Sequence, residues 1–308
     1  IKLRNGLVDV RLSTMPTPYG ESVVMRLLGR EAAKSSLSEL GMGDHILTRM
    51  RRLLDRPHGL VLVTGPTGSG KTTTLYAALS ELNSTETKII TVEDPIEYRL
   101  SGITQVQVNE KIGLDFTRVL RSTLRQDPDI LLVGEIRDPE TAQISMRAAL
   151  TGHLVLSTLH TNDAAGTPMR LLDMGVPRYM IGMSLVAVIA QRLIRLICES
   201  CAHPENLSEA EDDWLSRQLD GKPVPRQCMV GHGCTHCNGM GYQGRVGVYE
   251  MLEMNPVLVD AMYHAEPSVF SGLAGQQMGG QTLRQQAVDL VLAGRTSVRE
   301  AIRVSQYE

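Results

Sequence analysis

Aromatic side chains and net positive charge are both scarce in this chain. Its 308 residues include two Phe, eight Tyr and one Trp, and the formal net charge is −3. Proteins that bind single-stranded nucleic acid stack bases on aromatic rings, and a basic surface attracts the phosphate backbone. The sequence also has no long run of Lys and Arg. The composition therefore argues against a nucleic-acid translocase.

The chain begins without methionine, and its first residues resemble neither a signal peptide nor a transit sequence. We expect a fragment whose first domain is cut short, with about two domains in the length present. The most apolar segment, residues 179–197, contains Gln191, Arg192 and Arg195, and its uncharged stretch is too short to span a bilayer. We predict a core helix there.

The most specific motif is a glycine-rich segment between a predicted strand and a predicted helix. Residues 60–63 are apolar, residues 65–72 fit the pattern G-x-x-x-x-G-K-[ST], and residues 73–82 continue as a helix. Gly-rich turns also close ordinary strand–helix units, but the complete motif in this context predicts a site for a nucleoside triphosphate. Lys71 would contact the β- and γ-phosphates, and the Thr72 hydroxyl would bind Mg²⁺. The predicted nucleotide-binding residues are Gly65, Pro66, Thr67, Gly68, Ser69, Gly70, Lys71, Thr72 and Thr73.

Strand and helix patterns alternate after this motif, which predicts an α/β fold with a mainly parallel sheet. Strands are expected at residues 88–92, 130–133 and 154–156, helices at 44–55, 116–126, 139–150 and 163–174, and an edge strand or hairpin arm at 103–108. The three apolar strands end in the polar sequences EDPIE, GEIRD and STLH. Because the carboxyl ends of parallel strands meet at one edge of a sheet, we expect Glu93, Glu135 and His160 to share a site beside Lys71.

These residue types suit hydrolysis, which needs Mg²⁺ and a group that orients the attacking water. Gly134 stands where an Asp often holds the metal, so we expect Glu135 to support Mg²⁺ through water. Glu93 is then the preferred water-orienting carboxylate, and His160 is a candidate hydrogen-bond donor to the γ-phosphate. His153 either has the same role or only packs.

Other charged residues near these strand ends have two interpretations each. Asp94 and Glu97 either join the site or cap and brace their loop, as loop acids often do. Arg121, Arg125 and Arg137 flank the acids. An isolated arginine on a helix usually faces solvent, so the sequence alone makes none of the three an arginine finger.

Four of the five cysteines form two Cys-x-x-Cys pairs, which predict a closed, structural Zn²⁺ site with four thiolates. The predicted ligands are Cys198, Cys201, Cys234 and Cys237. Unligated thiols are the alternative. The ligand set stays open because a fifth cysteine and three histidines are possible substitutes: Cys228, His203, His232 and His236. The polar segment between the pairs, residues 205–227, is predicted to be a short helix and a surface loop.

Two further regions flank the predicted core. Residues 8–12 and 22–28 look like strands that finish a small domain, and residues 244–252 are also strand-like. Helices are expected at 256–264, 282–293 and 298–304. The predicted division is 1–30 for the end of an N-terminal domain, 31–43 for a linker, 44–197 for the nucleotide-binding core, 198–242 for the zinc subdomain and 243–308 for a helical C-terminal region.

The ordered set of motifs resembles the secretion ATPases of type II secretion systems and type IV pilus assembly, within the RecA-like hexameric motors. The motifs are VDVRLSTMPT at residues 8–17, SVVMRLL at 22–28, the P-loop at 65–72, TVEDPIEY at 91–98, LRQDPDI at 124–130 with GEIRD at 134–138, and GHLVLSTLHTN at 152–162. They cover essentially the whole chain. The resemblance implies a RecA-like P-loop NTPase core with a truncated N-terminal α+β domain, a four-Cys zinc subdomain and a helical C-terminal cap.

The resemblance also implies site residues, cofactors and partners. Arg11 and Arg26 match arginines of the family's second N-terminal domain, and Arg121 and Arg137 match arginines near the nucleotide, so all four are candidate catalytic residues. The implied cofactors are ATP, Mg²⁺ and Zn²⁺. The implied assembly is a homohexamer, in which the N-terminal domain of one subunit closes over the nucleotide of its neighbour. It would work with the cytoplasmic part of an inner-membrane platform protein and a membrane-bound adaptor, and not with nucleic acid.

The function expected from this resemblance is hydrolysis of ATP that powers assembly of a type IV pilus or a type II secretion pseudopilus. The motor would be cytoplasmic and peripheral at the inner membrane. A pilus retraction motor is the alternative, although such motors generally lack the four cysteines. A RecA-type nucleic-acid translocase and a zinc-bearing adaptor that binds ATP without turnover are the remaining hypotheses.

Overall fold

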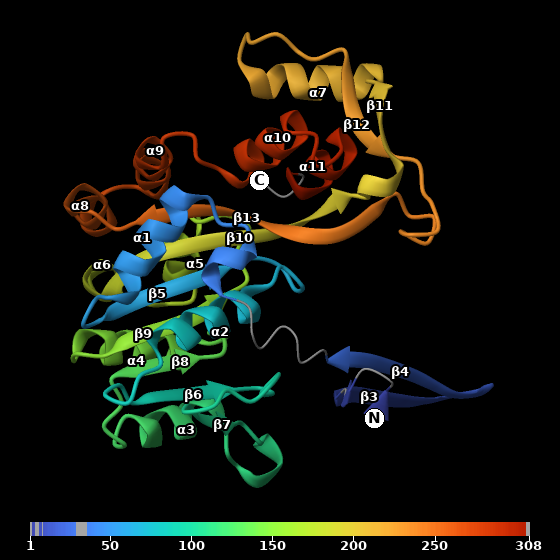
Figure 1. Ribbon diagram of the computed structural model, residues 1–308. Coiled ribbons are helices and arrows are strands. Elements are labelled where there is room, and N and C mark those ends of the chain that lie inside the picture. The colour runs from blue at the N-terminus through green and yellow to red at the C-terminus, as the bar shows by residue number, and fades with distance from the viewer. Residues whose placement is uncertain (1, 4–5, 8, 29–35, 306–308) are drawn as a thin grey trace.

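A seven-stranded, mainly parallel sheet forms the centre of the computed structural model, which describes residues 2–3, 6–7, 9–28 and 36–305 (Figure 1). The strand order is β13-β10-β5-β9-β8-β6-β7, and β10 and β13 form its antiparallel pair. The strands are β5 (Gly59–Thr64), β6 (Ile89–Glu93), β7 (Thr104–Gln107), β8 (Ile130–Val133), β9 (Leu154–Leu159), β10 (Leu185–Ile197) and β13 (Tyr242–Glu253). The predicted α/β fold is confirmed.

The two faces of the sheet bury separate apolar cores. Leu60 and Leu62 of β5 belong to one core, and Val61 and Val63 belong to the other. Helices α1 and α2 cover the second core, and α3 to α6 cover the first. Their bounds are α1 (Asp44–Leu54), α2 (Lys71–Leu82), α3 (Phe116–Thr123), α4 (Pro139–Leu150), α5 (Thr167–Asp173) and α6 (Arg178–Ser184). Burial on both faces explains why the central strands are continuous apolar runs.

The predicted core helix at residues 179–197 is wrong. Helix α6 ends at Ser184, and the remaining residues form the 13-residue strand β10, which lies between β5 and β13. A buried strand and a buried helix are both apolar all round, so periodicity cannot separate them. The β-branched residues Val186, Val188, Ile189, Ile194 and Ile197 favour the strand, because their side chains pack well on a pleated surface.

The C-terminal third adds a hairpin and five helices beside the long β10–β13 ribbon (Figure 1). The bounds are β11 (Ala202–Asn206), α7 (Glu209–Leu219), β12 (Gln227–Gly231), α8 (Pro256–His264), α9 (Pro267–Met278), α10 (Leu283–Leu292) and α11 (Val298–Ser305). The three predicted C-terminal helices match α8, α10 and α11. The sequence does not indicate α9, which contains the weak helix formers Gly272 and Gly275. It does not indicate the β11–β12 hairpin either, which is polar and includes Pro204.

The segment predicted to be a linker is packed in its second half. Residues 37–40 form a 3-10 helix, and the Leu37 side chain is fully buried in the core beneath α1 and α2. Tyr249 of β13 donates a hydrogen bond to the Leu40 carbonyl, 3.0 Å away. Residues 29–35 lie outside the described part of the chain.

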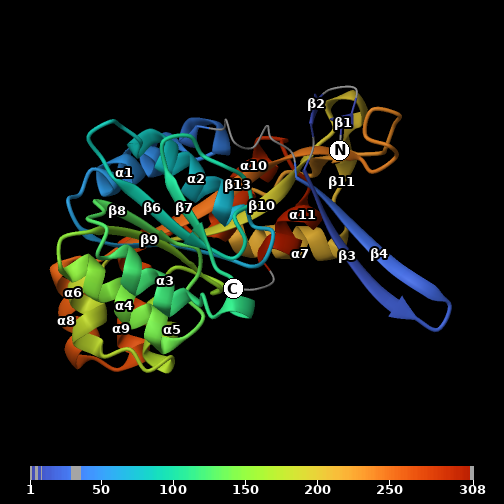
Figure 2. The same cartoon turned by 90° about the horizontal axis from the view of Figure 1, so that it is seen from below.

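A two-stranded hairpin precedes this segment. Strands β3 (Asp9–Thr17) and β4 (Gly20–Leu28) pair along their whole length, and the register places Arg11 opposite Arg26. Short strands β1 (Lys2–Leu3) and β2 (Gly6–Leu7) pair before it. Figures 1 and 2 show β3 and β4 projecting away from the central sheet. No helix among the described residues is long and apolar enough to cross a membrane.

Candidate functional site

The glycine-rich loop connects the end of β5 to the start of α2. Its three glycines have positive φ angles, 143° at Gly65, 80° at Gly68 and 88° at Gly70. A Cβ atom on Gly65 would lie 2.4 Å from the Gln191 carbonyl oxygen of β10. Glycine is therefore required there for both backbone conformation and close packing. The loop forms one wall of a cleft of about 540 Å³.

Lys71 is the first residue of α2, and its side chain folds back over the loop. Its Nζ atom donates hydrogen bonds to the carbonyls of Gly65, 2.8 Å away, and Pro66, 3.1 Å away. Burial is the main cause that lowers the pKa of Lys71 to about 8; the charge of Glu135 opposes this shift, and that of Arg192 adds to it. An ammonium group and the N-terminus of α2 thus face the same cleft, which is the arrangement that binds a phosphate chain.

The structure brings the three predicted strand-end residues together opposite this loop. Glu93 ends β6, Glu135 follows β8 and His160 follows β9, and all three line the cleft with Lys71 and Thr72. His160 Nε2 lies 3.6 Å from one oxygen of Glu135, which is within ion-pair range. The cleft therefore holds carboxylates, a cation and a hydroxyl, the groups that bind Mg²⁺ and phosphate.

Glu93 is almost fully buried, and three side chains donate hydrogen bonds to it. Tyr76 of α2 donates to Oε2. Thr91 at 2.5 Å and Gln105 of β7 at 3.2 Å both donate to Oε1. In the hydrogen bonds of the described residues, Oε1 has both lone pairs engaged, whereas Oε2 accepts from one donor and keeps one lone pair. That remaining lone pair is the part of Glu93 that could accept a hydrogen bond from water.

Tyr76 and its neighbour Tyr98 enclose this carboxylate. Their rings meet edge to face with centroids 4.5 Å apart. Burial first, and then the contact with Glu93, raises the pKa of both phenols, that of Tyr98 to about 12. Tyr76 is thus a neutral donor at neutral pH. Tyr76 is absent from the residues predicted for the site, and the available signal is its place on α2, the helix that begins at the phosphate loop.

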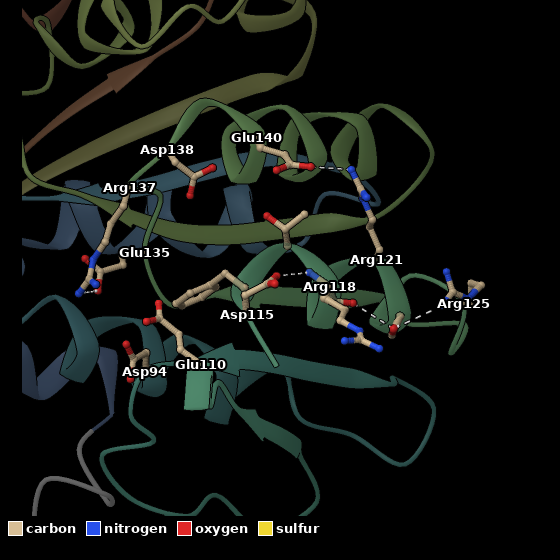
Figure 3. Close-up of a pocket in the computed structure, with 13 residues that line it drawn as sticks. Asp94, Glu110, Asp115, Arg118, Arg121, Arg125, Glu135, Arg137, Asp138 and Glu140 are labelled. Carbon is tan, nitrogen blue, oxygen red and sulfur yellow. Dashed lines mark hydrogen bonds and ion pairs between the residues drawn. The ribbon is translucent and has the colours of Figure 1, made fainter. Parts of the chain in front are cut away.

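A second cleft of about 780 Å³ adjoins the first and contains the predicted arginines (Figure 3). Arg137 lines both clefts, and its guanidinium lies 2.5 Å from Glu135. Arg121 lines only the second cleft and pairs with Glu140 of α4 at 2.6 Å. Arg121 therefore lies apart from the phosphate loop in this conformation.

Not every candidate lies near the phosphate loop. His153 precedes β9, at the opposite end of that strand from His160, and its Nδ1 lies 2.9 Å from the Ala148 carbonyl oxygen. It packs at the start of the strand. Arg11 and Arg26 lie on β3 and β4, and their side chains fall outside the described part of the structure.

The four predicted cysteine ligands form a cluster at the far end of the β10–β13 ribbon. Sγ–Sγ distances are 3.8 Å for Cys198–Cys234, 3.9 Å for Cys201–Cys237 and 3.8 Å for Cys234–Cys237. Zn–S bonds of ~2.3 Å in a tetrahedron place sulfurs about 3.8 Å apart, so the donor set fits Zn²⁺. The four sulfurs share one cluster, and among the described residues it includes neither Cys228 nor a histidine.

Backbone amides also support thiolate ligands in this cluster. The N–H groups of Cys234 and Gly241 donate to Cys237 Sγ at 3.1 and 3.2 Å. Burial opposes ionisation, but these donors hold the pKa of Cys237 below its ordinary value. Gly231 and Gly241 let the two chain segments meet, because a Cβ on Gly231 would lie 2.0 Å from the Gly241 carbonyl oxygen.

The sheet order, the glycine loop and the acids around Lys71 define a P-loop nucleotide-binding domain. Residues 1–303 match the family described as Type II/IV secretion system protein, and the chain belongs to that family. It is 48% identical over 310 residues to the type II secretion system protein E of Dickeya dadantii, covering 100% of this chain and 61% of that protein. It is also 48% identical over 308 residues to the type II secretion system ATPase E of Vibrio cholerae, covering 99% and 60%.

A solved structure agrees with this assignment. The pilus retraction motor PilT, crystallised with bound ADP, has a TM-score of 0.70 and 30% identity, covering 96% of this chain and 74% of PilT. The chain therefore spans about three-fifths of the length of the curated relatives and most of the solved one.

Proposed function

We propose that this chain is the ATP-hydrolysing part of a motor that powers assembly of a type II secretion pseudopilus. The observation that carries the proposal is the cleft in which Glu93, Glu135 and His160 face Lys71 and Thr72, in a chain closely similar to a type II secretion ATPase. The reaction is transfer of the γ-phosphoryl group of ATP to water, with release of ADP and phosphate.

Each cleft residue has a distinct part in this proposal. The loop amides from Gly65 to Thr73 would hold the phosphates, Lys71 would neutralise the β- and γ-phosphates, and the Thr72 hydroxyl would hold Mg²⁺. Glu135 would support Mg²⁺ through water, and the remaining lone pair of Glu93 Oε2 would orient the attacking water. His160 donates to the γ-phosphate. Mg²⁺ supplies charge neutralisation when bound, and the chain's residues supply orientation.

Zinc has a structural role in the proposal. The four thiolates complete a tetrahedral shell, so the ion would lack an open position for catalysis. It would join the end of β10 to the start of β13 and close residues 198–242 as a subdomain. The predicted division into 1–30, 31–43, 44–197, 198–242 and 243–308 remains our proposal, with residues 36–40 added to the core because Leu37 is buried there.

The proposed working form is a homohexamer at the cytoplasmic face of the inner membrane, acting with a platform protein and an adaptor. The transferred phosphoryl group would be stabilised by four arginines, some of them from the neighbouring subunit: Arg11, Arg26, Arg121 and Arg137.

The likeness to PilT supports a retraction motor as the second candidate function. The higher identity to type II secretion proteins and the four cysteines favour assembly.

A pair of histidine variants tests the cleft directly. His160→Ala should reduce ATP turnover by about 10-fold or more, in line with loss of one charge-stabilising donor. His153→Ala removes the same ring from the other end of β9 and should leave turnover near wild type. Lys71→Ala should weaken binding of a fluorescent ATP analogue itself. Equal turnover in all three variants would refute the site, and stimulation of turnover by DNA or RNA would favour a nucleic-acid motor instead.

A further inference from the structure

A second group of metal-binding side chains lies next to the four cysteines. His203 and Glu205 are on β11, and His232 follows the end of β12. One ligand atom from each of the three lies within 4.8 Å of the others. Alternate residues of a strand share a face, so His203 and Glu205 project from the same side of the hairpin. We propose that these three residues form a second metal site for a divalent transition-metal ion, distinct from the four-cysteine site.

His203 is oriented as a metal ligand would be. Its Nδ1 lies 3.4 Å from the carbonyl oxygen of Cys201, and its Nε2 is buried without a hydrogen-bond partner among the described residues. Metal-binding histidines usually donate one ring N–H to a backbone carbonyl, which leaves the lone pair of the other nitrogen for the metal. A buried ring nitrogen without a partner is costly, and a metal ion would satisfy it.

Glu205 lies at the distance that such a site needs. Its Oε2 is 3.6 Å from His203 Nε2, too far for a hydrogen bond. Zn²⁺ binds imidazole and carboxylate at ~2.0–2.1 Å, so two such ligands in a tetrahedron lie about 3.4 Å apart. The spacing therefore matches two ligands around one ion more closely than a simple hydrogen-bonded pair.

His232 supplies the third ligand after a side-chain rotation. Its ring stacks on that of His203 with centroids 3.3 Å apart and planes 13° apart. Stacked rings direct their lone pairs in parallel, so one ring must turn before both bind the same ion. His232 is exposed and free to make this movement, whereas Cys201 holds His203 in place.

The surroundings leave room for further ligands. Glu205 and His232 border a cleft of about 310 Å³ between the hairpin, α7 and the start of α11. Glu211, which also lines this cleft, is already paired with Arg299 at 3.1 Å. Two imidazoles and one carboxylate suit Zn²⁺ and other borderline divalent ions, and water would complete the shell from the cleft.

Metal titration of the whole chain tests this inference, which does not depend on ATP hydrolysis. Protein whose four-cysteine site is filled with Zn²⁺ should take up a second equivalent of Zn²⁺ in calorimetry. Added Co²⁺ should give weak visible bands without thiolate charge-transfer absorption. His232→Ala should keep the first equivalent and bind the second at least 10-fold more weakly, and Glu205→Gln should also weaken it.

His236→Ala is the matched control, because this histidine is also exposed and lies outside both clusters. It should keep both equivalents, and thermal unfolding should show that all three variants fold. Three results would overturn the proposal: one equivalent in the wild type, a second equivalent of unchanged affinity in His232→Ala, or thiolate absorption from the added Co²⁺ without release of Zn²⁺, which would place the ion on Cys228.

Discussion

Glu93 is held by three donors in a site where it must orient water, and this arrangement makes Tyr76 a positioning residue. Thr91 and Gln105 engage one carboxylate oxygen, and Tyr76 engages the other. A carboxylate with one donor missing would rotate more freely within its pocket. The position of the last free lone pair relative to the γ-phosphate therefore depends on the phenol.

Tyr76→Phe should lower kcat for ATP about 10-fold and leave KM nearly unchanged, because the phenol acts on Glu93 and not on the bound nucleotide. A hydrogen bond to a charged group contributes roughly 1.5–3 kcal/mol, and 1.4 kcal/mol corresponds to tenfold in rate. Glu93→Gln should lose most turnover and keep nucleotide binding. A kcat near wild type in Tyr76→Phe would contradict the positioning role.

Nucleotide binding should depend on pH through Lys71, because burial lowers the pKa of its ammonium group to about 8. Below that pH the group is charged and attracts phosphate. As the pH rises through 8 the free protein loses this charge, so the Kd for Mg-ATP should rise by up to about tenfold per pH unit. Lys71→Arg stays charged and should show a much flatter Kd between pH 7 and 9.5 in equilibrium binding. Parallel pH profiles in the two proteins would contradict the assignment.

The sequence predicts some residues of the nucleotide cleft but not the side chains that contact them. Glu93 and Lys71 are recognisable because a strand end and a phosphate loop are local patterns. Tyr76 and Gln105 are not, because their contact with Glu93 brings together α2, β6 and β7, and only the folded sheet defines that meeting point.

A buried carboxylate helps to join helix α11 to the central sheet. The Glu300 side chain is fully buried and accepts hydrogen bonds from Arg195 of β10 at 2.7 Å and from Arg303 at 2.7 Å. Burial alone would raise its pKa, but the two guanidinium groups lower it to about 2. The ion pair therefore stabilises the fold wherever Glu300 is ionised.

Glu300→Gln should reduce the free energy of unfolding by about 2 kcal/mol at pH 7, the scale of a lost hydrogen bond to a charged group. Because the folded pKa is depressed, this contribution is present above pH 4.5 and is lost as the pH falls toward 2. Urea denaturation should therefore show the variant and the wild type converging in that window. Glu140→Gln breaks the exposed pair with Arg121 and should cost less than ~1 kcal/mol.

The β10 strand shows which elements the sequence could not assign. Glycines, caps and short apolar runs located β5, β6, β8 and α4 correctly, because those signals are local. Residues 185–197 are largely apolar on both faces, and only pairing with β5 and β13 decides that they form a strand. The polar β11–β12 hairpin is likewise defined by its contacts, since its sequence has little β propensity.

In the whole molecule, the β3–β4 hairpin has several exposed apolar side chains. Leu12, Met15, Val24 and Met25 are each at least 59% exposed. The hairpin register sets Arg11 opposite Arg26. A two-stranded hairpin is also marginal alone. These features suit a segment that works against another surface, and our proposal places the nucleotide of a neighbouring subunit there.

Arg26→Ala should then abolish ATP turnover while ATP binding stays near wild type, and Arg11→Ala should have the same effect in milder form. An arginine supplied in trans contributes roughly 10³- to 10⁵-fold to phosphoryl transfer, far more than an exposed ion pair contributes to stability. A site completed by a neighbouring subunit is active only when chains assemble. The ATP turnover per chain of the wild type should therefore rise with protein concentration.

Mixing two inactive variants separates action in trans from action within one chain. Arg26→Ala chains keep an intact phosphate loop, and Lys71→Ala chains keep an intact hairpin. In a mixed ring, an Arg26→Ala chain whose neighbour is a Lys71→Ala chain has a complete composite site, so part of the activity should return in proportion to such interfaces. Co-assembly is verified by pulling down one tagged variant with the other. If co-assembled mixtures stay inactive, Arg26 acts within its own chain or serves the fold of the hairpin, and the shared-site proposal fails.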